Sequence, residues 1–236
     1  MNASRTARER VRAELIREIT DIARRHLATE GAAGLSLRAV AREMGMVSSA
    51  IYRYFPSRDD LLTALIIDGY NAIGEAVEQA EATCPRDDYL ARWLACCRAV
   101  RTWALNHPHE YALLYGSPVP GYHAPTDTVP AAIRDTVVYG RIISDAHHAG
   151  ALTPPELGPQ PPAVFTEDAD RLREIIPGVP DDLVARAVTA WTTLFGMVNF
   201  ELFGQFNNAI YARDALFDHT MTRMAAFIGI PGTTTA

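Results

Sequence analysis

The chain has 236 residues, of which 48% are apolar, and its net charge is −6 at pH 7. This length suits two small domains or one of medium size, with enough apolar side chains for a core. No uncharged apolar run reaches the roughly 18 residues of a membrane span, and the N-terminus lacks the apolar segment of a signal peptide, so we expect a cytoplasmic protein without a membrane partner. Three cysteines, two of them adjacent at Cys96 and Cys97, argue against a disulfide framework.

Charge is distributed unevenly along the chain. Residues 1–58 hold eleven arginines and six acidic residues, a net charge of +5, whereas residues 59–236 carry −11. A basic N-terminal block beside an acidic remainder is typical of a DNA-binding head on a body that does not bind DNA. On charge alone, a surface asymmetry without function remains an alternative.

Helical periodicity runs through the chain, and no alternating strand pattern of useful length interrupts it. A first helix is expected over about residues 8–30. Ser36 is positioned to cap a short second helix, Gly45 supplies a turn, and a third short helix is expected over residues 49–54. Two such helices form a helix-turn-helix, whose second helix enters the major groove of DNA.

The later helices follow from capping residues and prolines. Ser57 and Asp60 have the spacing of a capping box at the start of a fourth helix, which Pro85 ends. Further helices are expected at about 87–106, 109–115, 129–149, 167–176, 181–205 and 214–228. A loop rich in proline, residues 150–163, is expected to be mobile, and the tail from Pro231 is expected to be disordered. The predicted fold class is all-α.

The helix-turn-helix region resembles the DNA-binding domain of the TetR (tetracycline-repressor-type) family. The resemblance rests on Gly45, on the stretch AIYRYF at residues 50–55 and on the stretch PSRDDL at residues 56–61. Tyr54 stands where the family commonly has His, and Arg58 where it commonly has Lys, but both can still donate to phosphate. The resemblance implies a DNA-binding domain at residues 1–57 and a helical effector-binding and dimerisation domain at residues 58–236.

The C-terminal region resembles the WHG ligand domain of some TetR-type regulators. The similar segments are HPHEYALLYG at residues 107–116, the Pro-Gly-Tyr loop at 120–122, and Trp191 followed by Phe195-Gly196. That domain is named for a Trp and a later His-Gly pair. Here Phe195 replaces the His, so any role tied to that His is absent.

The candidate DNA-binding residues are Arg38, Ser48, Ser49, Ala50, Tyr52, Arg53, Tyr54 and Arg58. By resemblance, Arg38 reaches a base edge, where arginine reads guanine with two hydrogen bonds, and a phosphate contact is the alternative. Ser48, Ser49 and Arg53 are candidate base readers. The two tyrosines are expected to contact phosphate or a thymine methyl group, and Arg58 to contact phosphate.

Aromatic side chains gather in the second domain at helical spacing. Core packing explains most of them one by one, but ligand pockets in helical bundles use the same residue types with a few polar groups. The candidate ligand-binding residues are Trp103, Tyr111, Tyr115, Tyr122, His123, Tyr139, Trp191, Phe195 and Asn199. The sequence places no arginine cluster near them, so we expect a small, largely apolar or aromatic ligand.

Motifs for other chemistries are missing from the sequence. The pairs His107-x-His109 and His147-His148 do not have the spacing of a zinc motif. There is no Gly-x-Ser-x-Gly, phosphate-binding glycine loop or His-Glu-x-x-His. We therefore expect no metal site, no cofactor and no catalytic residue.

The sequence predicts a homodimeric transcriptional regulator, most simply a repressor, that a small-molecule effector releases from a palindromic operator in double-stranded DNA. By family resemblance, the last two long helices pair with their two-fold mates through Leu183, Ala187, Ala190, Leu194, Val198, Leu216, Phe217, Met221 and Met224. One alternative is a regulator of the same fold without a small-molecule effector, constitutive or controlled by a protein partner. The other is a helical enzyme with a fortuitous helix-turn-helix.

Overall fold

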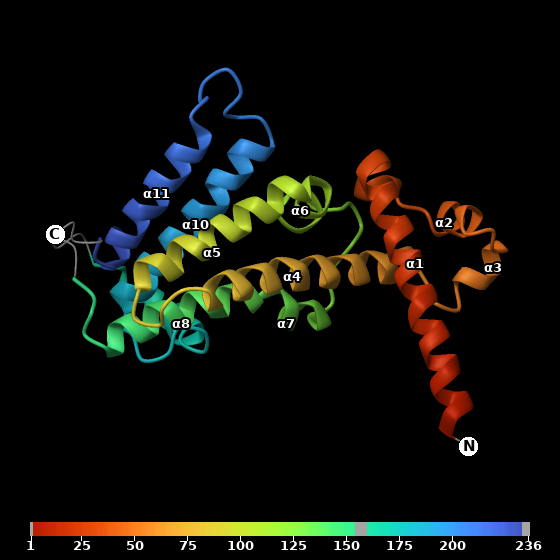
Figure 1. The fold of residues 1–236 in the computed structure, drawn as a ribbon, viewed down its shortest axis with the longest axis horizontal. Coiled ribbons are helices and arrows are strands. Elements are labelled where there is room, and N and C mark those ends of the chain that lie inside the picture. Colours follow the sequence, from red (N-terminus) through yellow and green to blue (C-terminus); the bar gives the residue numbers. More distant parts are fainter. Residues whose placement is uncertain (1, 154–159, 233–236) are drawn as a thin grey trace. The chain divides into compact units, whose positions relative to one another are not determined.

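The computed structural model describes residues 2–153 and 160–232, and Figure 1 shows that helices dominate them. These ranges contain no strand, which confirms the all-α prediction. The helices are α1 Asn2–Gly34, α2 Leu37–Glu43, α3 Ser48–Ile51, α4 Arg58–Ala82, α5 Tyr89–Asn106, α6 Pro108–Tyr115, α7 Val129–Ala132, α8 Arg134–His148, α9 Thr166–Leu172, α10 Asp181–Leu202 and α11 Arg213–Ile228. Much of the loop expected to be mobile, residues 154–159, and the tail at 233–236 lie outside the described residues.

Contacts between elements divide the chain into two compact units. Unit 1 comprises Met1–Tyr70 and His107–Ala132, and unit 2 comprises Asn71–Asn106 and Ile133–Ala236. Helix α4 contributes its first half to unit 1 and its second half to unit 2. This division differs from the expected boundary after residue 57 in two respects. The first half of α4 belongs to unit 1, and so does α6, which packs against α1.

The core of unit 1 is apolar throughout. Ile19 of α1, Leu37 of α2, Ile51 of α3 and Leu61 of α4 are at most 5% exposed and form one cluster. At about 25 cal/mol per Å² of apolar surface removed from water, such side chains stabilise the packing of short helices that would not persist alone. Helix α1 loses its regular geometry at Gly31, whose φ of +68° interrupts it where the glycine predicted an end.

Ion pairs connect helix α6 to α1 and α4 of unit 1. The guanidinium of Arg24 on α1 contacts Asp68 on α4 at 2.8 Å and Glu110 on α6 at 3.2 Å. After α6, the Tyr122 hydroxyl and the Thr63 hydroxyl of α4 share a hydrogen bond of 2.8 Å. These contacts explain why α6 and the loop that follows it pack as part of unit 1.

In unit 2, α10 and α11 run side by side, and α5 packs on both (Figure 1). The indole N–H of Trp93 on α5 donates to the carbonyl of Met221 on α11 at 2.9 Å. Among the described residues, α10 has the length and mean hydropathy of a membrane span. A core helix has the same composition, and Leu183, Val184 and Leu194 of α10 are at most 2% exposed within unit 2.

A buried ion network joins the second half of α4 to α5 and α8. Arg92 of α5 is fully buried, and its guanidinium contacts Glu81 of α4 at 2.7 Å and Asp145 of α8 at 2.9 Å. Arg141 of α8 contacts the second oxygen of Glu81 at 2.9 Å. Each buried charge of this network therefore has an opposite charge within hydrogen-bond distance, which stabilises it away from water.

Three helix boundaries predicted for the C-terminal half of the chain were wrong. The helix expected at 129–149 is broken at Ile133, where φ is −93° and ψ is 0°, although no glycine or proline marks the site. The segment after α9 turns instead of continuing to 176, because Arg173 donates to the Val179 carbonyl and pairs with Asp181. Helix α10 ends at Leu202, shortly before Gly204 adopts a left-handed φ of +88°.

Candidate nucleic-acid interface and effector region

Gly45 builds the turn between α2 and α3. Its φ of +66° lies in the left-handed region, and the Met46 N–H donates to the Ala41 carbonyl at 2.8 Å, which closes the end of α2. A Cβ on Gly45 would meet no atom within 4 Å, so the backbone conformation, not space, requires glycine there. Ser36 occupies the predicted N-cap of α2, but its side chain makes no capping hydrogen bond.

The recognition segment is a shorter helix than predicted. Helix α3 ends at Ile51, and residues 52–54 continue as a tight turn, in which the N–H groups of Arg53 and Tyr54 bond to carbonyls three residues earlier. Ile51 and Phe55 are buried in the core of unit 1. These two anchors fix the segment, so the side chains around them remain at the surface.

Most of the predicted DNA contacts are at this surface. The exposed ones are Arg38 on α2, Ser48 and Ser49 on α3, and Tyr52 and Arg53 in the turn. Ala50 and Tyr54 are half-buried. The exposed set offers hydroxyl and guanidinium donors, which bind phosphate oxygens and base edges.

The N-terminal part of α1 adds Arg12, which the sequence did not single out, beside Arg8, for which a minor-groove arm or a solvated tail was expected. The guanidinium of Arg12 lies 5.2 Å from the centroid of the Tyr54 ring and donates to the Arg53 carbonyl at 3.2 Å. Arg8, one turn earlier on α1, lines the same surface hollow as Arg12 and Tyr54. The i, i+4 spacing of the two arginines was the sequence signal available for this pair.

Arg58, which was predicted to contact phosphate, donates to backbone carbonyl groups. Its guanidinium donates to the Ala32 carbonyl at 2.6 Å and to the Leu35 carbonyl at 3.1 Å. These bonds satisfy one carbonyl in the last turn of α1 and one just after the helix. The capping box beside it is confirmed, since the Ser57 N–H donates to the Asp60 carboxylate and the Asp60 N–H donates to the Ser57 hydroxyl.

The nine predicted effector residues are divided between the two units. In unit 1, the Tyr115 ring lies 4.9 Å from the Tyr111 ring and 5.9 Å from the Tyr70 ring. Burial raises the pKa of Tyr111, so its hydroxyl stays protonated. Tyr122 bonds to Thr63 as described above, and His123 is exposed in the loop that follows.

The other five residues belong to unit 2. Tyr139 on α8 is buried and packs edge-on against the Trp93 ring, with centroids 5.4 Å apart. Phe195, at the position where the WHG pattern has His, packs against Trp191 with centroids 5.1 Å apart. Trp103 on α5 is buried, and Asn199 on α10 is half-buried.

The cysteines of unit 2 are not present as reactive thiolates. Burial raises the pKa of the Cys96 thiol to about 12, and that of Cys97 is raised as well, so both stay protonated at neutral pH.

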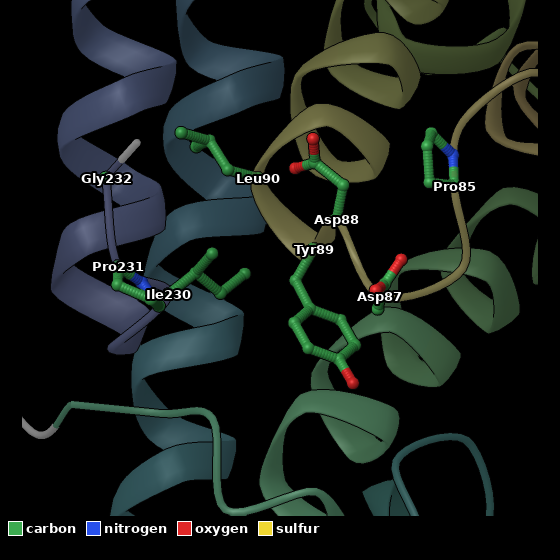
Figure 2. Close-up of a pocket in the computed structure, with 8 residues that line it drawn as sticks. All are labelled: Pro85, Asp87, Asp88, Tyr89, Leu90, Ile230, Pro231 and Gly232. Atoms are coloured by element: carbon green, nitrogen blue, oxygen red, sulfur yellow. The ribbon is translucent and has the colours of Figure 1, made fainter. Parts of the chain in front are cut away.

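A surface hollow of about 420 Å³, shown in Figure 2, is lined by Pro85, Asp87, Asp88, Tyr89, Leu90, Ile230, Pro231 and Gly232. None of the nine predicted effector residues lines this hollow.

The exposed donors on a helix-turn-helix define a DNA-binding transcriptional regulator, and comparisons agree. The model of the tetR family of bacterial regulatory proteins matches residues 19–65, and that of the tetracyclin repressor-like C-terminal domain matches residues 93–224. The HTH-type transcriptional regulator Rv1816 of Mycobacterium tuberculosis is 41% identical over 221 residues, which cover 91% of this chain and 88% of that protein. Mb1846 of Mycobacterium bovis matches with the same values.

Solved structures show the same fold. The putative regulatory protein SCO4313 is 34% identical with a TM-score of 0.75, and the match covers 92% of this chain and 98% of that one. A protein of unknown function from Rhodococcus sp. RHA1 is 28% identical with a TM-score of 0.65, over 91% and 93% of the two chains. The chain belongs to the TetR family of transcriptional regulators, as the resemblance of its helix-turn-helix predicted.

Proposed function

We propose that the protein binds a palindromic operator in double-stranded DNA as a cytoplasmic homodimer and represses transcription. The observation that carries this proposal is the exposed set of donors that Gly45, Ile51 and Phe55 hold in place. The proposed base readers are Arg38, Ser48, Ser49 and Arg53, with Ala50, Tyr52 and Tyr54 beside them on phosphate or a thymine methyl group. Arg8 and Arg12 add phosphate contacts, whereas the carbonyl partners of Arg58 favour a structural role over phosphate binding.

Selection of DNA fragments by the purified protein tests the operator. We expect a palindrome, with affinity that falls steeply between 50 and 200 mM salt, because each phosphate contact contributes a slope of about −0.9 in log K against log salt. Arg38→Ala should relax sequence preference at one base pair, at a cost of about 1–3 kcal/mol. Arg25→Ala on α1 is the control and should keep that preference. A uniform loss on all sequences in Arg38→Ala would make Arg38 a phosphate contact.

The proposed dimer uses a different face of α10 and α11 from the one first predicted. Seven of the nine residues named for it are buried within unit 2, among them Leu183, Leu194 and Phe217, each at most 2% exposed. They form the core of one protomer and cannot also be its interface. The outward face of these helices carries Thr192, Gly196, Phe200, Thr222, Ala226 and Phe227, with a groove of about 450 Å³ along α11.

Ala226→Arg tests this face. Ala226 is exposed in one protomer, so the variant should fold, but a charge in the middle of a two-fold contact would face its own mate. We expect it to sediment as a monomer and to lose operator affinity. Thr102→Arg, at an exposed position of α5, is the matched control and should stay dimeric. A dimeric Ala226→Arg protein would place the interface elsewhere.

We further propose that a small, largely apolar or aromatic effector releases the operator. The residues predicted for it remain the candidates, with Trp103, Tyr139, Trp191, Phe195 and Asn199 in unit 2. Arginines near α5 and α8 are engaged, since Arg92 and Arg101 pair with carboxylates, which leaves no evident clamp for an anion. The same fold in RolR, 15% identical with a TM-score of 0.52, was determined in complex with resorcinol.

Linked titrations test the effector response. An effector that binds the DNA-free conformation better must weaken operator binding by the same factor by which operator weakens effector binding. We expect aromatic ligands to quench tryptophan fluorescence and to show this reciprocity. Operator binding that no ligand of a broad aromatic panel changes would favour the alternative, a regulator without a small-molecule effector.

A further inference from the structure

The first turn of α8 places a carboxylate where the helix pattern calls for an apolar residue. The buried stripe of α8, which packs against α5, consists of Val138, Tyr139, Ile142, Ile143 and Ala146. Asp135 lies three and four residues before the first two of these, so it continues the stripe by one turn. Its side chain is only 2% exposed. Carboxylates are rarely so buried without a partner, because desolvation penalises the charge.

Within the described part of the chain, one oxygen of Asp135 has no partner. The Thr136 hydroxyl donates to Oδ1 at 3.3 Å, whereas Oδ2 accepts no hydrogen bond. The arginines of α8 are engaged elsewhere, since Arg134 contacts Glu78 at 2.7 Å and Arg141 contacts Glu81 at 2.9 Å. Burial raises the pKa of Asp135 to about 6, so at neutral pH the carboxylate is mostly ionised.

A preference for acids at helix starts does not account for this burial. An acidic residue in the first turn stabilises a helix through its dipole, but it does so from the surface as well. Asp181 and Asp182 in the first turn of α10 show the usual arrangement. They are half-buried, and they pair with Arg173 and Arg186.

A second buried polar atom in unit 2, a hydrogen-bond donor, also lacks a partner among the described residues. The indole Nε1 of Trp191 on α10 is buried and has no acceptor among the described residues. The Trp93 indole, by contrast, donates to a backbone carbonyl. Both α8 and α10 pack against α5. Unit 2 thus holds an unpartnered acceptor and an unpartnered donor among largely apolar helices, which is the polar pattern of a site for an apolar ligand with few oriented groups.

We infer that Asp135 is the recognition residue of the effector site, an inference that rests on the proposed effector response. The effector is a largely apolar, ring-containing molecule that donates one hydrogen bond, from a hydroxyl or an amine, to Asp135 Oδ2. Such a bond to an ionised acceptor out of water discriminates strongly against an isostere without the donor. The Trp191 N–H favours molecules that also offer an acceptor.

The test uses the full-length protein and probes that differ in one group. One series is 2-phenylethanol, 2-phenylethylamine and propylbenzene, and the other is 2-naphthylmethanol, 2-naphthylmethylamine and 2-ethylnaphthalene. Binding is measured by tryptophan fluorescence and by thermal shift. In at least one series we expect the hydroxyl or the amine to bind about tenfold more tightly than the hydrocarbon.

Four variants test which residues cause the preference for the hydroxyl or the amine over the hydrocarbon. Asp135→Leu should abolish it, and Asp135→Asn, which keeps an uncharged carbonyl acceptor, should retain part of it for the hydroxyl and lose it for the amine. Trp191→Phe keeps a ring without the N–H and should weaken binding of the hydroxyl several-fold. Asp87→Asn is the matched control, because Asp87 is an exposed carboxylate at the hollow of Figure 2, and it should change no affinity.

Equal binding of donor and hydrocarbon probes, or a preference that survives in Asp135→Leu, would overturn the assignment of Asp135 while leaving an effector site in place. A preference lost in Asp87→Asn would move the site to the hollow of Figure 2. If no probe of either series binds, the inference fails, whereas operator binding is measured without probes and is judged separately. Without probe, Asp135→Leu should melt no lower than the wild type, and a marked fall would assign Asp135 a structural role.

Discussion

The helix-turn-helix of unit 1 keeps its charges at the surface, whereas unit 2 encloses several of them. Arg38 and Arg53 are exposed around an apolar core. In unit 2, Arg92, Glu81 and Asp135 are at most 6% exposed. A surface function can be inferred from local spacing, because solvent supplies most of the partners there. The role of a buried charge depends on whether a distant element neutralises it, as for Arg92, or not, as for Asp135.

The largest effect on stability expected from this difference is at Arg92, which is buried and pairs with Glu81 and Asp145. Arg92→Met leaves Glu81 without its buried partner, and we expect a loss of about 3–5 kcal/mol in the free energy of unfolding, measured by urea denaturation. Arg98→Met on the same helix is the control. Its contact with Asp218 is half-exposed on both sides, so its removal should cost less than about 1 kcal/mol. Similar losses in both variants would remove the distinction between buried and exposed pairs.

At Asp135, in contrast to Arg92, the charge of the side chain should lower the free energy of unfolding, because no opposite charge among the described residues neutralises it. Because its pKa is raised from 3.8 to about 6, the folded state binds more protons than the unfolded state between these pH values. Wild-type stability should therefore fall relative to Asp135→Asn as the pH rises from about 4 to about 6, by up to about 3 kcal/mol. Urea denaturation of both proteins at several pH values measures the gap. A gap that does not change with pH would mean that Asp135 has a charge partner.

In unit 1, removal of an exposed arginine should change DNA affinity rather than stability. Arg12→Ala should weaken binding to all duplexes by about 1–2 kcal/mol and lower the salt slope by about 0.9, because one phosphate contact is lost. Arg10→Ala on the same helix is the matched control, since Arg10 is exposed but, unlike Arg12, does not line the hollow beside Tyr54. Equal slopes for the two variants would remove Arg12 from the interface.

The smallest expected effect is a difference in the reactivity of the three cysteine thiols of unit 2. Cys96 and Cys97 are fully buried with raised pKa values, whereas Cys84 is half-buried. A thiol reagent added to the native protein should label Cys84 first, and Cys84→Ser should react only after denaturation. Rapid labelling of native Cys84→Ser would contradict the burial of Cys96 and Cys97.

The local structure of the helix-turn-helix was largely predictable because its determinants are close in sequence. Gly45 indicated the turn through its conformational freedom, and the capping box of Ser57 and Asp60 is a three-residue pattern. The carbonyl partners of Arg58 could not be predicted, because they lie 23 and 26 residues away in the sequence. The contact between Arg12 and Tyr54 was missed for the same reason, since it joins α1 to the turn after α3.

The sequence by itself determined the helices, the helix-turn-helix and the family, because periodicity, caps and turn residues act over three or four positions. Tertiary structure alone decided which apolar faces are core. The stripe of α10 through Leu194 suits a dimer contact and a protomer core equally well, and only its packing in unit 2 distinguishes them. It also decided the difference between Arg92 and Asp135, because the neutralisation of a buried charge depends on groups that folding brings from distant parts of the chain.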